Sequence, residues 1–252
     1  MESWLQRRLR FRMLYIVATP IGNLEDITLR AISVLRSADF ILAEDTRVTR
    51  VLLDKYSIPT KSISYHQHSG FQKIEQIIEL LKEGKNLALV TDAGTPGIND
   101  PGNYLVMKCL EAIPDLKIVP IPGSNAAITA LSVSGFPSDK FIFLGFPPHK
   151  KGRMTFFQRI NLLEDTIVFY ESKYRILKAL EELKKFSLVG LPAQAGERQI
   201  VVARELTKQF ETIYRGTVDQ IMLKLNSHKN NLLGEFVVVV GPREKIKEHE
   251  DE

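Results

Sequence analysis

Short, uninterrupted apolar runs recur along the first half of the chain, and stretches with helical spacing lie between them. A run such as residues 86–91 is typical of a strand buried on both faces of a sheet. Residues 71–82 show the other pattern: isoleucines and leucines three and four positions apart predict an amphipathic helix. The strands predicted in this half are residues 14–18, 40–43, 61–65, 86–91 and 116–121. Their alternation with helices predicts a parallel sheet covered by helices on both faces.

The second half of the chain is less regular. Its predicted strands are residues 141–146, 166–170, 200–203, 210–214 and 235–240. The third and fourth of these are near enough in sequence to pair as a hairpin. Because the regular alternation ends near residues 122–137, we place a domain boundary there. The expected division is a basic extension at 1–12, an α/β domain at 13–123, a second α/β domain at 124–242 and a charged tail at 243–252.

The composition is that of an ordinary globular protein, 44% hydrophobic and 25% charged over 252 residues. A single cysteine, Cys109, excludes an internal disulfide framework and a metal site built from several cysteines. The net charge of +4 permits an anionic partner such as RNA without requiring one.

No apolar run approaches the ~20 residues needed to span a membrane. Four arginines precede residues 13–18 in the manner of a signal peptide, but no convincing cleavage site follows. We therefore interpret residues 13–18 as the first core strand and expect a cytoplasmic protein.

Three loops that follow predicted strands combine glycine or proline with small polar residues. They are residues 19–23, 92–102 and 122–127. Ligands of open α/β sheets bind outside the carboxyl ends of strands, where such loops expose bare backbone. A tight connection with a capping aspartate would explain the loop at Asp92 taken alone, but three such loops favour a ligand site. The chain lacks both the Gly-x-Gly-x-x-Gly fingerprint and the Gly-Lys-Ser/Thr phosphate loop.

Residues 44–47, Glu-Asp-Thr-Arg, place two carboxylates and a guanidinium at another strand end. In a purely structural interpretation, Asp45 or Thr46 caps the following helix. Capping explains one residue of the cluster, so we favour a site. His66 and His68 stand at alternate positions, which face opposite sides of a strand, and no other cluster of metal ligands accompanies them. We expect histidines that face solvent or RNA, and no metal.

In the second half, charged residues at strand ends leave two interpretations open. Glu171 and the pair Arg204-Glu205 suit structural ion pairs as well as function. Residues 149–153, His-Lys-Lys-Gly-Arg, suit a solvated loop as well as contacts to RNA phosphates.

Six segments together carry a resemblance to one family. They are residues 19–24 (Thr-Pro-Ile-Gly-Asn-Leu), 44–47 (Glu-Asp-Thr-Arg), 92–96 (Asp-Ala-Gly-Thr-Pro), 98–102 (Ile-Asn-Asp-Pro-Gly), 169–172 (Phe-Tyr-Glu-Ser) and 203–208 (Ala-Arg-Glu-Leu-Thr-Lys). In this order they resemble the bacterial small-subunit ribosomal RNA 2′-O-ribose cytidine methyltransferases of the tetrapyrrole methylase superfamily. Two departures stand near the central loop: Thr91 where the family usually has serine, and Gly97 where a larger residue is common.

The resemblance implies a parallel sheet in the first domain, a mixed sheet in the second, S-adenosylmethionine in the cleft between the domains, and a homodimer. The implied substrate is small-subunit ribosomal RNA, free or in the assembled subunit. By motif match, the residues implied to contact the cofactor are Pro20, Gly22, Asp92, Ala93, Gly94, Thr95, Ser124, Asn125, Ala126 and Tyr170. The residues expected to contact the RNA are His66, His68, Lys150, Lys151, Arg153 and Arg204.

A ribose 2′-hydroxyl is a poor nucleophile, and a carboxylate that accepts its proton would add ~10²–10⁴-fold to the rate. We expect Glu44 or Asp45 to be this base, with Arg47 ordering the pair or gripping a phosphate, and Glu171 and Glu205 in reserve. Two alternatives stay open: a methyltransferase of a corrin or sirohaem precursor, and a non-catalytic ribosome-binding factor. The missing dinucleotide fingerprint disfavours a nicotinamide dehydrogenase.

Overall fold

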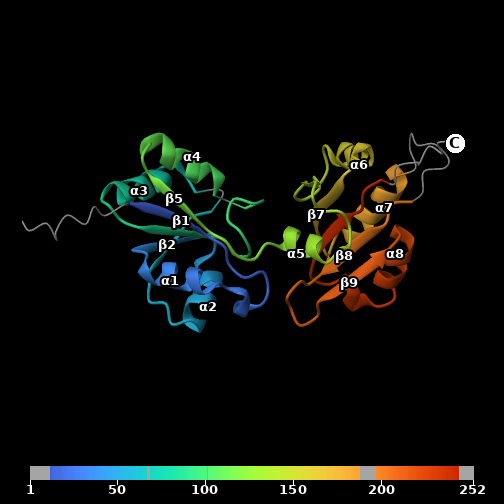
Figure 1. The fold of residues 1–252 in the computed structure, drawn as a ribbon, viewed down its shortest axis with the longest axis horizontal. Coiled ribbons are helices and arrows are strands. Elements are labelled where there is room, and N and C mark those ends of the chain that lie inside the picture. The colour runs from blue at the N-terminus through green and yellow to red at the C-terminus, as the bar shows by residue number, and fades with distance from the viewer. Residues whose placement is uncertain (1–11, 67–68, 101, 188–196, 244–252) are drawn as a thin grey trace, which may run out of the picture. The chain divides into compact units, whose positions relative to one another are not determined.

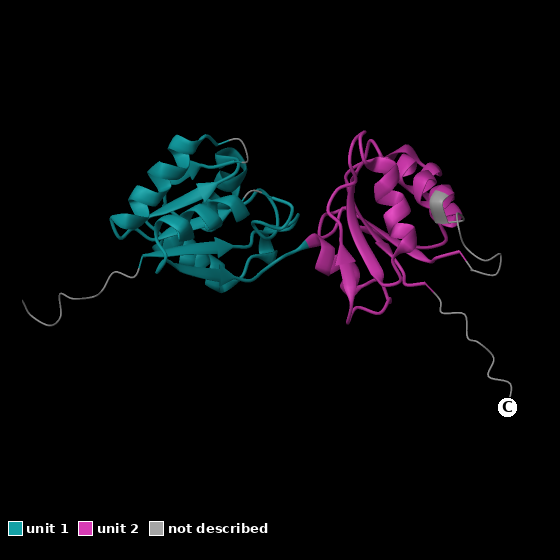
Figure 2. Cartoon of the chain, turned by 90° about the horizontal axis from the view of Figure 1, so that it is seen from above, with its two compact units in different colours: residues 1–125 teal, residues 126–252 magenta. Residues whose placement is uncertain are grey.

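The computed structural model describes residues 12–66, 69–100, 102–187 and 197–243. The chain divides into two compact units, residues 1–125 and 126–252 (Figure 2). The expected basic extension, apart from Arg12, and nearly all of the expected charged tail lie outside the described residues, as does His68.

The first unit contains a five-stranded parallel sheet in the order β3-β2-β4-β1-β5. Its strands are β1 (Met13–Val17), β2 (Phe40–Ala43), β3 (Ser62–Ser64), β4 (Leu87–Val90) and β5 (Lys117–Ile121). Its helices are α1 (Leu29–Ser37), α2 (Thr46–Lys55), α3 (Phe71–Lys82) and α4 (Asn103–Ala112), with a 3₁₀ turn at Leu24–Asp26. The predicted parallel sheet is therefore confirmed.

Both faces of this sheet are covered, with α1 and α2 on one side and α3 and α4 on the other (Figure 1). The position of strand β4 between two helical layers explains why its sequence is uniformly apolar. Leu87 and Leu89 pack in the cluster of α3 and α4, whereas Ala88 and Val90 pack in the cluster of α1 and α2. All four side chains are buried, as a parallel strand between two helical layers requires.

The second unit contains a mixed sheet in the order β6-β7-β10-β8-β9, in which only β6 and β7 are parallel. Its strands are β6 (Phe141–Phe143), β7 (Thr166–Ser172), β8 (Ile200–Arg204), β9 (Thr212–Gly216) and β10 (Glu235–Val240). Its helices are α5 (Ala126–Ser132), α6 (Arg153–Leu162), α7 (Ile176–Ser187) and α8 (Val218–Asn226), with a 3₁₀ turn at Lys229–Leu232. Helices α6, α7 and α8 cover one face, around Phe157, Phe169 and Phe236.

Several predicted boundaries move in the structure. The strand expected at 141–146 ends at Phe143, because Gly145 takes a left-handed backbone and two prolines follow. The strand expected at 210–214 lies at 212–216, since the chain first turns through left-handed Glu205 and Thr207. The predicted hairpin of β8 and β9 is confirmed. The segment predicted as a loop at 122–127 gives way to α5 at Ala126.

Candidate active site

The three predicted loops meet at the carboxyl edge of the first unit's sheet. Thr19 and Gly94 exchange backbone hydrogen bonds of 2.9 and 3.1 Å, which join the loop after β1 to the loop after β4. The Thr19 hydroxyl also donates to the Thr91 carbonyl at 3.0 Å. The Thr95 hydroxyl donates to the Ser124 carbonyl at 3.2 Å, which adds the loop after β5. Hydrogen bonds therefore link the three loops to one another.

Two glycines make this arrangement possible. Gly94 has a φ of +84°, and a Cβ there would lie 3.4 Å from the Ile21 side chain. Gly97 has a φ of +83°, and a Cβ there would meet Asn103 Oδ1 at 2.5 Å. The Asn103 amide instead donates to the Gly97 carbonyl at 2.8 Å, so glycine suits this version of the loop.

The residues implied to hold the cofactor differ in exposure. Gly22, Asp92 and Ala93 are exposed, Thr95, Ser124, Asn125 and Ala126 are partly buried, and Pro20 and Gly94 are buried. Those up to Asn125 belong to the first unit, whereas Ala126 and Tyr170 belong to the second. Within the second unit, the Ala127 amide donates to the Tyr170 hydroxyl at 3.2 Å. The rings of Phe143 and Phe146 pack edge-on against Tyr170.

Carboxylates from three segments gather at the same edge of the first unit. The Thr91 hydroxyl donates to Glu44 Oε2 at 2.6 Å, and the Asp45 amide donates to Asp92 Oδ1 at 3.0 Å. Asp45 caps α2 by accepting from the Arg47 amide at 2.8 Å, and the Arg47 guanidinium pairs with the same carboxylate at 2.6 Å. The capping role of Asp45, weighed as an alternative from the sequence, is therefore confirmed.

The acids of this edge have different proton affinities. Hydrogen bonds from Arg47 lower the pKa of Asp45 to about 2. Burial raises the pKa of Asp92, and the neighbouring Glu44 adds to the rise. Burial, together with repulsion from Glu44 and Asp92, raises the pKa of Asp100 to about 6. Asp100 was not among the predicted site residues, although it lies in the same loop as Asp92, and that proximity was the available signal.

The other predicted residue at this edge is His66, which follows β3 and is exposed. Its backbone amide donates to the Ser69 hydroxyl at 2.9 Å. Within the described ranges, no group of three histidine, cysteine, aspartate or glutamate side chains is arranged so that it could hold a metal ion. None of the helices described by the structure is both long enough and apolar enough to cross a bilayer.

In the second unit, Glu171 lies at the end of β7 with a fully buried side chain. Arg153 donates to one of its carboxylate oxygens at 3.3 Å, and Arg175 forms an ion pair with the other at 3.0 Å. Arg153 also pairs with Glu182 at 2.7 Å, and its own side chain is only 5% exposed. Nothing in the sequence singled out Arg175 and Glu182. Their ion pairs with Glu171 and Arg153 join different segments of the chain, so only the fold brings these partners together.

Arg204 is also buried. Its guanidinium donates to three carbonyls, those of Leu233, Phe210 and Asn230, at 2.7 to 3.1 Å. This arginine therefore holds together the connections around β9 and β10. Among the residues predicted to contact RNA in the second unit, Lys150 and Lys151 alone present exposed side chains.

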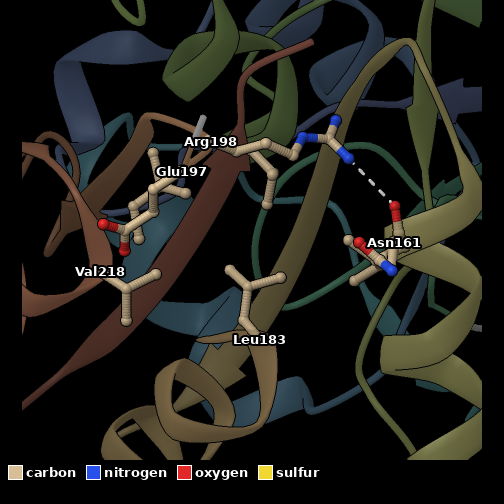
Figure 3. A pocket seen from close by; sticks show the side chains of 8 residues that line it. Asn161, Leu183, Glu197, Arg198 and Val218 are labelled. Carbon is tan, nitrogen blue, oxygen red and sulfur yellow. Dashed lines mark hydrogen bonds between the residues drawn. The ribbon is translucent and has the colours of Figure 1, made fainter. Parts of the chain in front are cut away.

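A small pocket lies elsewhere in the second unit, between α6, α7 and the sheet (Figure 3). Apolar residues line most of it, and its volume of about 10 Å³ is at the lower limit for one water. The Arg198 guanidinium at its rim donates to the carbonyls of Ile160, Leu163, Asp165 and Gly241. Burial lowers the pKa of Arg198 to about 10. None of the predicted site residues lines this pocket.

Comparison with known proteins places the chain in a family. Residues 13–222 match the family model of the tetrapyrrole (corrin/porphyrin) methylases. The chain is 47% identical over 229 residues to the ribosomal RNA small subunit methyltransferase I of Escherichia coli O157:H7, covering 90% of this chain and 77% of that protein. The protein of the same name from Pasteurella multocida is 44% identical over 241 residues, covering 95% and 82%.

Solved structures share the fold at much lower identity. A cobalt precorrin-4 methyltransferase superposes with a TM-score of 0.64 at 18% identity, covering 94% of this chain and 98% of that one. A diphthine synthase gives a TM-score of 0.64 at 14% identity, covering 91% and 90%. The chain therefore belongs to the tetrapyrrole methylase family, in the group of the ribosomal RNA small subunit methyltransferases I.

Proposed function

We propose that this protein is an S-adenosylmethionine-dependent methyltransferase that methylates the 2′-hydroxyl of a cytidine ribose in small-subunit ribosomal RNA. One observation carries the proposal: the loops after β1, β4 and β5 meet at one sheet edge beside the Glu44 carboxylate, in a chain 47% identical to a protein named ribosomal RNA small subunit methyltransferase I. The reaction belongs in the cytoplasm, and we propose that the active form is a homodimer.

The residues of this edge suit S-adenosylmethionine. The cofactor carries cationic sulfonium and ammonium groups, and the edge gathers Glu44, Asp92 and Asp100 with Arg47 as the cation beside them. Exposed backbone at Gly22 and Ala93 offers donors and acceptors for its polar groups. Ser124 and Asn125, from the loop joined to Thr95, complete the set in the first unit. When bound, the cofactor supplies an already activated methyl group.

Glu44 is the carboxylate that we propose as the base. The Thr91 hydroxyl fixes one of its oxygens at 2.6 Å, and no cation in the described part of the chain forms an ion pair with it. Asp45 is a poorer base, because its pKa of about 2 lies far below neutral pH and both of its oxygens bind Arg47. Asp45 instead orients Arg47, whose side chain is 89% exposed and free to contact a phosphate of the RNA.

The remaining predicted substrate residues divide by exposure. His66, Lys150 and Lys151 are exposed and are proposed to contact the RNA directly. Arg153, Arg204 and Glu171 are buried. We propose that they position the loops to which they are bound and do not contact the RNA themselves. Separate assays with naked RNA and with assembled small subunits distinguish these two substrates.

The test uses methyl-labelled S-adenosylmethionine with small subunits, and separately with naked RNA, from cells that lack this modification. Label on the 2′-oxygen of one cytidine is the expected result. A tetrapyrrole precursor is assayed in parallel, and label on it alone would show that the substrate is a tetrapyrrole and not RNA. Tight cofactor binding without any transfer would favour a non-catalytic ribosome-binding factor.

The matched variants are Glu44→Gln and Asp45→Asn. The first should lower kcat by ~10²–10⁴-fold with little change in binding of cofactor or RNA, because only proton acceptance is removed. The second should change stability little, because asparagine caps a helix about as well as aspartate, and it should keep most of the turnover. Full turnover in Glu44→Gln would exclude this residue as the base.

A further inference from the structure

Two turns of the second unit lie at one edge of its sheet. Strands β6 and β7 are parallel, so the segments that follow them, residues 144–152 and 173–175, leave from the same side. The backbone confirms this proximity, since the Tyr170 amide donates to the Gly145 carbonyl at 3.0 Å. Figure 1 shows that these turns lead into neighbouring helices, α6 and α7.

A buried carboxylate fixes both turns. Arg153, which ends the first turn, binds one oxygen of Glu171, and Arg175, from the second turn, binds the other. Arg153 also donates from its side chain to the Pro148 carbonyl at 3.3 Å and from its amide to the Lys150 carbonyl at 3.2 Å. Arg175 donates to the Ser172 hydroxyl at 3.2 Å. The two turns are therefore held in a fixed relation by one network.

The surface of these turns is basic and aromatic. Lys150 and Lys151 are exposed on the first turn, and Lys173 and Tyr174 are exposed on the second. The Tyr174 side chain is 85% exposed, with Lys173 Nζ 5.0 Å above its ring. Residues 140–163 contain no aspartate or glutamate, and neither do residues 172–180. None of these three lysines pairs with a carboxylate in the part of the chain that the structure describes.

We propose that these turns form an RNA-binding surface in which Tyr174 stacks on an unpaired base while Lys150, Lys151 and Lys173 bind the flanking phosphates. This proposal rests on the proposed function and deepens it. In single-stranded RNA each base has a phosphate next to it. An exposed aromatic ring can stack on the base while a neighbouring ammonium group binds the phosphate. Glu171, Arg153 and Arg175 are positioning residues, because they hold the turns and do not reach the RNA.

The principal variant is Tyr174→Ala, with Tyr174→Phe as its matched control. Because stacking on one base contributes ~1–3 kcal/mol, Tyr174→Ala should weaken binding of small-subunit RNA by about 5- to 150-fold. Tyr174→Phe keeps the ring and should bind within about twofold of the wild type. Both variants should bind S-adenosylmethionine as the wild type does and unfold at the same temperature, because Tyr174 makes no core contact.

The lysines are tested by salt dependence. The double variant Lys150→Ala, Lys151→Ala should reduce the slope of log Kd against log salt by about 1.4, because two contacts to single-stranded phosphates are lost, at about 0.7 each. The control is Lys140→Ala. This exposed lysine precedes β6, at the end of the strand away from the two turns, so its loss should leave the slope unchanged.

The partner is identified by ultraviolet cross-linking of the wild type to small subunits, followed by mass spectrometry of the peptide that contains Tyr174. A nucleotide adduct is expected. An adduct to a ribosomal protein, or unchanged RNA affinity in Tyr174→Ala, would overturn this proposal while RNA methylation by the wild type still stands. Failure of the wild type to methylate RNA at all would instead overturn the proposed function.

Discussion

Neighbouring residues of like charge have different roles at the sheet edge of the first unit. Glu44 and Asp45 are adjacent, yet Arg47 binds both oxygens of Asp45 and a neutral hydroxyl binds Glu44. The side chain that carries the helix cap is therefore separated from the one left to accept a proton. Asp100, also at this edge, is partly buried near Glu44 and Asp92 and has a raised pKa.

Asp100 should make the stability of the protein depend on pH. Its pKa is about 6 in the folded protein, against an ordinary value of 3.8. Between these values the folded state retains a proton that the unfolded chain releases, so the free energy of unfolding falls as the pH rises. Asp100→Asn should match the wild type near pH 4 and exceed it by about 1 kcal/mol near pH 8, after allowance for solvent screening.

Urea denaturation across this pH range measures the effect. Asp54→Asn is the control, because this exposed carboxylate pairs with Arg50 on the surface and should leave the pH dependence unchanged. Identical pH profiles for Asp100→Asn and the wild type would show that Asp100 ionises normally.

Single elements were predictable where local patterns decide them. The helix predicted at 71–82 is α3 with the same bounds, because its buried face repeats at three and four positions. Thr217 caps α8 with a full capping box to Gln220, an arrangement that depends only on neighbouring residues. Strand β9 was misplaced by two residues, since its start depends on Arg204 binding carbonyls up to 29 residues away.

In the candidate site, too, contacts between residues that are distant in sequence could not be predicted. The motif residues of the first unit lie at the ends of parallel strands, and that topology brings strand ends together, so their proximity followed from the sequence. The burial of Arg153 and Arg204 did not follow, because a guanidinium suits phosphate and carboxylate equally well. Only the fold shows that Arg153 is already occupied by Glu171 and Glu182.

Strand β7 gives a prediction about stability. Glu171→Gln keeps the shape of the side chain but leaves Arg175 without its carboxylate partner and Arg153 with Glu182 alone. Removing one partner from a buried ionic network costs about 3–5 kcal/mol, so this variant should unfold at markedly lower denaturant concentration. Glu181→Gln, an exposed change on α7, is the control. A loss below about 1 kcal/mol would mean that water compensates the arginines.

On the scale of the whole molecule, each unit has its own hydrophobic core. The first unit has one cluster on each face of its parallel sheet, and the second has a cluster beneath α6, α7 and α8. The clusters do not share residues. Each unit therefore meets the requirement for a domain that folds by itself.

A fragment of residues 1–125 should thus fold alone. We expect the circular dichroism of an α/β protein and one cooperative thermal transition. Ile77→Ala, a change at a fully buried position of α3, should lower the stability of the fragment and of the whole chain by a similar ~2–5 kcal/mol. A fragment without a cooperative transition would show that the first unit needs the second.

The paired main chains of Thr19 and Gly94 have a consequence for how such a protein diversifies. Backbone hydrogen bonds, which do not depend on side-chain identity, connect the loops after β1 and β4. Mutations can therefore exchange the exposed side chains of these loops without dismantling their scaffold. A lineage built in this way can change the surface of its loops while the scaffold stays in place, and a cobalt precorrin-4 methyltransferase and a diphthine synthase share the fold at 18% and 14% identity.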